Sequence, residues 1–231
     1  YDYLSRSHNC LVEDQLQDVI FISNGEPMAE DNWNNLQELC PRAKRSDGVT
    51  GREAAYKAAA AMSDTPWFFA VFAKTEVLDS FKFDFQPDRM QAPKHYIFHS
   101  RNPVNGLEYG AMNINLYNRQ LTLDTRPGLD FTLSAAHEVV PILASISRFN
   151  TDPWVSWRSA FRECVKLSSR AIDRSYDEET DNRLEIWCKV GADKPFGKYA
   201  TGGARAGKDF GERYIGIDEI LCKINDFEWL E

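Results

Sequence analysis

Residues 18–23 (DVIFIS) and residues 67–72 (WFFAVF) are two short apolar runs that decide the fold class. Runs of this kind, rich in β-branched and aromatic residues, are typical of strands buried on both faces. Between them, residues 30–40 carry apolar residues at helical spacing, residues 43–48 suit a second strand, and the Ala-rich residues 51–63 favour a helix. The order strand, helix, strand, helix, strand predicts a parallel sheet covered by helices.

After residue 72 the sequence predicts further strands and a long helix. Residues 95–99 suit a strand, residues 113–123 suit one or two more, and the alternating residues 81–85 fit the same mixed sheet. The long helix is expected over residues 153–170, because Asp152 is a favoured N-cap residue and Pro153 suits the first helical position.

The last part of the chain alternates expected helices with irregular stretches. Residues 184–190 and 215–230 predict helices, whereas the acidic residues 176–182 predict a loop. The glycine-rich residues 197–211 predict a flexible excursion, which could form a mobile lid.

The length and composition suit a globular protein, since the chain has 231 residues of which 43% are hydrophobic. We expect a lead-in over residues 1–17, an α/β domain over residues 18–150 and a C-terminal helical extension packed on it over residues 151–231. The chain begins at Tyr1 rather than Met, so it could be a piece of a longer protein.

Charge and cysteine usage exclude several classes of protein. The 27 Lys and Arg residues against 35 Asp and Glu residues give a net charge of -8, which argues against broad binding to nucleic-acid backbone or to anionic membranes. No apolar run approaches the roughly 18 residues of a membrane helix, and no signal peptide is visible. The five cysteines lack the close pairs of a zinc site, so we expect them reduced and mostly buried in a cytoplasmic protein. They are Cys10, Cys40, Cys164, Cys188 and Cys222.

Four stretches carry a resemblance to a known family. They are DVIFISNGEP (18–27), DGVTGREAAYKAAA (47–60), KHYIFHSRNPVNGLEYG (94–110) and DPWVSWRSAFRECVKL (152–167). The chain from Asp18 to about Phe161 resembles inverting GT-A glycosyltransferases of the family-2 type, and more closely a group of uncharacterised glycosyltransferases of marine phages and metagenomic sequences.

This resemblance implies a three-layer αβα fold of GT-A type with a mixed, mainly parallel sheet. It also implies a nucleotide-sugar donor and an acceptor that could be a glycan, a DNA base or a protein. If the chain is viral, the expected location is the host cytoplasm.

Polar residues follow the expected parallel strands, where ligands bind in open α/β sheets. Ser23, Asn24 and Asp47 should therefore surround one crevice. The resemblance gives Asp47 the role of binding the nucleotide base. Arg52 opens the following helix, where free N–H groups and a cation suit a diphosphate. The alternatives are that Asp47 caps a turn and that Arg52 is a solvated helix charge.

The chain departs from the resembled family after the central strand. Ordinary members carry an Asp-x-Asp motif there, whose carboxylates bind Mg²⁺ or Mn²⁺. Phe72 and Lys74 stand in the register of those aspartates, and Glu76 is the one nearby acid. The usual site for a divalent metal is therefore not encoded, and no cofactor is indicated. Lys74 has two interpretations: its ammonium could replace the metal at the diphosphate, or it is an exposed lysine in a protein without catalysis.

The loop between residues 99 and 110 is rich in donors and acceptors and is a candidate acceptor or sugar site. The alternative is a structural turn stabilised by asparagine side chains, although Arg101 and Glu108 exceed what a turn needs. The candidate residues are His99, Arg101, Asn102, Asn105 and Glu108.

Inverting transfer needs a carboxylate that removes a proton from the acceptor hydroxyl. The resemblance places such an acid in the part of the chain where Glu138 is the first candidate and Asp130 the second. Alternatively, Glu138 is a structural residue at the start of a helix, favoured there by the helix dipole. Pro141 stands where the second histidine of an HExxH motif would be, which excludes a zincin.

The leading hypothesis is an inverting, hexosyltransferase-like enzyme that could act without a metal. Asp47 would bind the base, Arg52 and Lys74 would lie near the diphosphate, and Glu138 would be the general base. The first alternative is a GT-A-like module of a larger viral protein that binds a nucleotide-sugar or glycan without transferring it. The second is a structural or interaction role without a small ligand.

Overall fold

The computed structural model of the protein describes residues 16–131, 135–171 and 177–231. The predicted lead-in, except for its last two residues, lies outside these ranges, as does Cys10. The helices and strands are β1 (Asp18–Ser23), α2 (Ala29–Leu39), β2 (Lys44–Asp47), α3 (Arg52–Met62), β3 (Trp67–Phe72), β4 (Thr75–Val77), β5 (His95–Arg101), β6 (Glu108–Asn118), α4 (Arg119–Leu123), β7 (His137–Ser147), α5 (Pro153–Ser168), α6 (Glu178–Lys189), α7 (Gly197–Arg213), α8 (Asp218–Leu221), the 3₁₀ helix η2 (Cys222–Asn225) and α9 (Phe227–Leu230).

The chain forms two compact units. The first comprises Tyr1–His99, Gly110–Thr125 and Ala135–Ser145, and the second comprises Ser100–Tyr109, Arg126–Ser134 and Ile146–Glu231. The second unit takes in two stretches before residue 150 because Val104, Leu107 and Leu129 pack into the cores of the C-terminal helices. The expected division of the chain at residues 17 and 150 stays a prediction.

A seven-stranded sheet has the order β2-β1-β3-β6-β5-β7-β4. Strands β2, β1 and β3 are parallel, as the alternation of strands and helices predicts, whereas β6 runs antiparallel to β3. Ser23 lies opposite Asp47, and Ile22 lies opposite Phe72. The carboxyl ends of these three parallel strands therefore lie side by side, and we call this side of the sheet the carboxyl edge. The prediction of a mixed α/β fold is confirmed.

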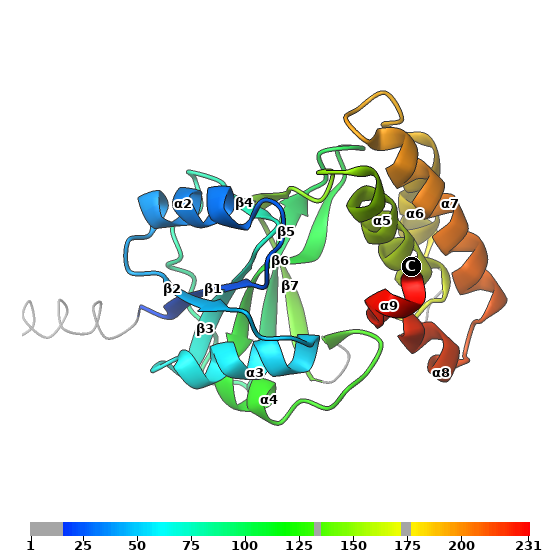
Figure 1. Ribbon diagram of the computed structural model, residues 1–231. Coiled ribbons are helices and arrows are strands. Elements are labelled where there is room, and N and C mark those ends of the chain that lie inside the picture. The colour runs from blue at the N-terminus through cyan, green and yellow to red at the C-terminus, as the bar shows by residue number, and fades with distance from the viewer. Residues whose placement is uncertain (1–15, 132–134, 172–176) are drawn as a thin grey trace, which may run out of the picture. The chain divides into compact units, whose positions relative to one another are not determined.

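Helices cover both faces of the first unit's parallel strands, with α2 on one face and α3 and α4 on the other (Figure 1). Ala59 and Ala60 of α3 are fully buried, and their small side chains allow the close approach of this helix to β1. On the face of α2, Leu36 packs with Phe21 and Phe69 in one hydrophobic cluster.

Two parts of the predicted sheet differ in the structure. Residues 81–85 lie outside any strand, and Phe81 and Phe83 pack their rings 4.9 Å apart in the core. Their alternation reflects insertion into the hydrophobic cluster rather than strand pairing. Residues 119–123 form helix α4, because the Asn118 side chain caps it by accepting a hydrogen bond from the Leu121 N–H.

The second unit confirms the long helix. The Asp152 carboxylate accepts a hydrogen bond from the Val155 N–H at 2.8 Å, and Pro153 occupies the first position of α5. The acidic stretch predicted as a loop instead begins helix α6, with Asp177 as N-cap. Acids in the first turn are favoured by the helix dipole, so Glu178 and Glu179 fit a helix start.

The glycine-rich residues 197–211 are not a flexible excursion, and the prediction of a mobile lid is wrong. They belong to α7, which packs closely on α5. A Cβ atom added to Gly203 would lie 2.2 Å from the Trp157 carbonyl oxygen, and one added to Gly207 would lie 2.3 Å from that of Phe161. The glycines let two helix backbones approach, and that packing outweighs their low helix propensity. The single closing helix expected over residues 215–230 is replaced by the short helices α8, η2 and α9.

His95 makes the stability of the first unit dependent on pH. Its ring is buried, and its Nδ1 accepts a hydrogen bond from the Asn118 N–H at 3.1 Å. Burial, and then the charge of His137, lower the pKa of His95 to about 4 from the ordinary 6.5. Because the unfolded chain takes up the proton first, unfolding free energy should fall by about 3 kcal/mol as the pH drops from about 6.5 to about 4, and stay constant above that window.

Urea unfolding at several pH values measures this effect, and the His95→Asn variant should lose most of the decline. His99→Gln, a change on the same strand, should keep it. An equal decline in His95→Asn and the unchanged protein would contradict the assignment.

Candidate functional site

Side chains from the ends of β1 and β2 meet at the carboxyl edge of the parallel strands. The Ser23 hydroxyl donates a hydrogen bond to Asp47 Oδ1 at 2.5 Å. Arg45 donates from Nε to Ser23 Oγ at 3.0 Å, and its Nη2 lies 3.4 Å from Asp47 Oδ1. The structure thus brings together Ser23 and Asp47, as predicted. It adds Arg45, which sequence reasoning missed.

Arg45 is further held by helix α2. Its Nη2 donates to Glu30 Oε1 at 2.7 Å, and its guanidinium lies 5.7 Å from the ring centre of Phe21 and 5.8 Å from that of Trp33. The hydrogen bond with Glu30 raises the pKa of Arg45 and lowers that of Glu30. The position of Arg45 two residues before Asp47, on the same face of the strand, is the signal that would have identified it.

At this edge the Asp47 carboxylate is accessible to ligands, whereas the Ser23 side chain that contacts it is buried. The Asp47 side chain is 56% exposed, whereas Ser23 beneath it is only 2% exposed. Asn24 lies in an exposed turn, where its backbone N–H donates to Glu26 Oε2. Gly25 has a φ of 77°, which allows the chain to turn away from the strand end.

Helix α3 begins beside this edge, after the loop that follows Asp47. Its N-cap is Gly51, and no side chain of the described residues caps its first N–H groups. Arg52 pairs with Glu53, with Nη2 at 2.6 Å from Oε1. The first turn of α3 therefore offers backbone donors next to a cation whose charge is already shared with a neighbouring acid.

Lys74 lies at the same edge, two residues beyond the end of β3. It forms a turn with Ala73, and the Asn32 side chain fixes that turn by donating to the Ala73 carbonyl at 2.7 Å. Lys74 is partly buried. In the described ranges of the chain, no group of three or more His, Cys, Asp or Glu residues is placed to hold a metal ion.

Glu138 lies at the opposite edge of the sheet. Trp67, the first residue of β3, donates from its indole to the Lys94 carbonyl at 2.9 Å, and the Lys94 ammonium forms an ion pair with Glu138. Glu138 is therefore close to the beginning of β3, not to its end. It lies in strand β7 rather than at the helix start considered from the sequence. The structure does not bring it together with Ser23 and Asp47.

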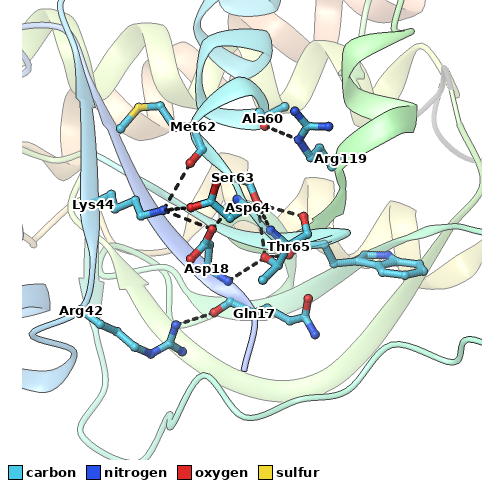
Figure 2. Close-up of polar contacts among 11 residues, drawn as sticks. Gln17, Asp18, Arg42, Lys44, Ala60, Met62, Ser63, Asp64, Thr65 and Arg119 are labelled. Carbon is cyan, nitrogen blue, oxygen red and sulfur yellow. Dashed lines mark hydrogen bonds and ion pairs between the residues drawn. The ribbon is translucent and has the colours of Figure 1, made fainter. Parts of the chain in front are cut away.

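Figure 2 shows the edge where the parallel strands begin, which is closed by a dense polar network. The Lys44 ammonium lies 3.3 Å from Asp18 Oδ2 and 3.0 Å from Asp64 Oδ2. Asp18 also accepts a hydrogen bond from the Asp64 N–H, and its own N–H donates to Thr65. These contacts tie the loop after α3 to the start of β1, so this edge has a structural explanation.

Asp130 belongs to the second unit and is paired there. Its Oδ2 lies 3.2 Å from the Lys166 ammonium, which is equally close to Glu163, and the Tyr109 hydroxyl donates to Glu163 at 2.9 Å. Burial alone would lower the pKa of Lys166, but the carboxylates of Glu163 and Asp130 outweigh it and raise that pKa. The lysine is therefore charged, and Asp130 has a structural partner.

The polar loop between β5 and β6 forms an ordered turn in the second unit. Asn102 Oδ1 accepts hydrogen bonds from the Val104 and Asn105 N–H groups, and Arg101 Nε donates to Glu108 Oε1 at 2.7 Å. The structural alternative accounts for these contacts, including the two charges that exceed what a turn needs. His99 lies in β5, partly buried in the first unit. Acceptor binding by these residues stays a prediction.

No protein-family model matches the sequence, and no curated protein matches it. Among solved structures, HddC from Yersinia pseudotuberculosis is similar to part of the chain, with a TM-score of 0.32 and 16% identity over 62% of this chain and 77% of that one. A likeness of this size carries no inference about fold family or function.

The remaining sequence expectations concern location. Cys40, Cys164 and Cys188 are buried thiols, and Cys222 is partly buried. None of the helices in the described residues has the length and apolar character needed to cross a bilayer. The cytoplasmic location stays a prediction.

Proposed function

We propose that the first unit binds a nucleoside diphosphate sugar at the carboxyl edge of β1, β2 and β3 and transfers the sugar to an acceptor. The observation that carries the proposal is the cluster of Ser23, Arg45 and Asp47 at this edge, beside the start of α3. The resemblance to inverting GT-A glycosyltransferases, proposed here on sequence motifs, agrees with that location.

The nucleoside part of the donor would contact Asp47. The Asp47 carboxylate is half-exposed and held by its neighbours, so it can accept hydrogen bonds from ribose hydroxyl groups or from a nucleobase N–H. Glu30 and Asp47 carry two negative charges against the one positive charge of Arg45. This end of the edge therefore disfavours phosphate.

The diphosphate would lie towards α3 and the end of β3. Uncapped N–H groups at the first turn of α3 attract anions, and Arg52 and Lys74 add positive charge on that side. In the transfer step the acceptor oxygen bonds to the anomeric carbon and loses its proton to solvent or a base, while the bond from that carbon to the diphosphate oxygen breaks and negative charge grows on that oxygen. An ammonium at Lys74 would stabilise this charge where the resembled family uses a metal ion.

A binding module without transfer is the second candidate. The separation of Glu138 from the carboxyl edge favours it, because that residue was the first choice for the general base. We therefore assign Glu138 no role in the reaction, and Asp130 as base stays a prediction.

Calorimetric titration with UDP-glucose, UDP-galactose and GDP-mannose, with and without Mn²⁺, tests the proposal. We expect binding that does not depend on the metal. Asp47→Asn should weaken it by about tenfold or more, since a hydrogen bond to a charged group contributes about 1.5–3 kcal/mol. Lys74→Ala should weaken it as well.

Asp64→Asn is the matched control, because it removes a carboxylate from the opposite edge and should leave the affinity unchanged. Release of free nucleoside diphosphate in the presence of an acceptor separates transfer from binding alone. No binding of any of the three sugars would contradict both candidates.

A further inference from the structure

Arg45 contacts Asp47 and side chains of β1 and α2 at the carboxyl edge. We propose that Arg45 is a positioning residue, which fixes the Asp47 carboxylate so that one of its oxygen atoms faces a nucleoside ligand. This inference rests on the proposed function and assigns a role to a further residue of the same site.

The guanidinium of Arg45 has little freedom of its own. It lies against the rings of Phe21 and Trp33, which attract a cation through their faces. Its side chain is 21% exposed, and its hydrogen bonds reach residues on β1, β2 and α2. A planar fork held on both its face and its edge is a rigid support.

This support sets the direction of the neighbouring hydrogen bonds. Arginine only donates, so Ser23 Oγ accepts from Arg45 Nε, and the single hydroxyl proton of Ser23 is given to Asp47 Oδ1. Arg45 Nη2 approaches the same Oδ1 atom. Within the described residues, both contacts of Asp47 therefore converge on one oxygen atom.

The other oxygen atom, Oδ2, is then oriented as a pure acceptor. It selects a neutral donor, such as a ribose hydroxyl or a base N–H, and repels phosphate. Arg45 also reduces the electrostatic repulsion between Glu30 of α2 and Asp47 of β2, because it pairs with both carboxylates. Without Arg45, Asp47 would turn towards solvent and away from Glu30, and the ligand would lose its fixed partner.

A double-mutant cycle with UDP as the probe tests whether Arg45 acts through Asp47. Arg45→Met should weaken UDP binding by about tenfold in the unchanged protein, yet by less than about twofold in the Asp47→Asn background. Lys94→Met is the matched control. Lys94 is a cation of similar exposure, 19%, that pairs with Glu138 at the opposite edge and lies over the ring of Tyr96, so its removal should leave UDP binding unchanged.

The outcomes separate this inference from the proposed function. If the unchanged protein binds no UDP, dTDP or GDP, the proposed function fails and the inference fails with it. If it binds UDP and Arg45→Met binds equally well, or if the loss is the same in both backgrounds, the inference is overturned while the proposed function stands. Should Arg45→Met not fold, Arg45→Lys decides by the same cycle, because it keeps the charge and removes the planar fork.

Discussion

Replacing Lys166 by methionine is expected to destabilise the second unit by about 3–5 kcal/mol, because it leaves buried carboxylates without their cation. Lys166 is only 16% exposed, and its partner Asp130 is 7% exposed. The same ammonium lies 3.2 Å from Glu163, so one substitution removes the counter-charge of two acids. Chemical denaturation followed by fluorescence measures the loss.

Lys189→Met is the control for this prediction. Lys189 also pairs with an acid of its own helix, Glu185, but both of these side chains are mostly exposed. Exposed pairs contribute about 0–1 kcal/mol, so the control should change stability little. A loss below about 1 kcal/mol in Lys166→Met would show that the carboxylates find other partners or water.

Replacing Gly207 by alanine is the second change with a large expected effect, about 3 kcal/mol of lost stability. The added Cβ would lie 2.3 Å from the carbonyl oxygen of Phe161, and backbone cannot move aside as a flexible side chain can. Helices α5 and α7 would have to separate. Thermal unfolding and amide hydrogen exchange in α7 measure the effect.

Gly202→Ala separates packing from helix propensity. Gly202 lies on the same helix, and its added Cβ would meet nothing within 4 Å. Alanine favours helix over glycine by about 1 kcal/mol, so this variant should be slightly more stable. If both substitutions changed stability in the same direction, the close approach of α5 and α7 would not be the cause.

The sequence predicts the first unit well where the signal is local. The apolar runs 18–23 and 67–72 and the alanines of α3 identify their elements, because burial and helix propensity act on neighbouring residues. Residues 197–211 show the limit. Their composition disfavours a helix, and only packing against α5, which is distant in sequence, makes glycine the residue that fits.

Some residues of the candidate site could likewise be predicted from the sequence, and others could not. The polar ends of β1 and β2 follow from strand order, so Ser23 and Asp47 could be predicted together. Glu138 could not be placed, because its position depends on which strand becomes the neighbour of β5 in a mixed sheet. Arg45 was missed because its role depends on Glu30 and Trp33 of a helix that packs over the strand.

Strand β2 has the sequence KRSD, without a single apolar residue, and is an outermost strand of the sheet. A hydrophobic pattern therefore cannot set its alignment with β1. Lys44 and Arg45 can, since Lys44 pairs with Asp18 at the start of β1 and Arg45 donates a hydrogen bond to Ser23 at its end. A slip by one residue would send each cation to the wrong face and break both sets of contacts. The charges of Lys44 and Arg45 together set the register of the strand that carries Asp47.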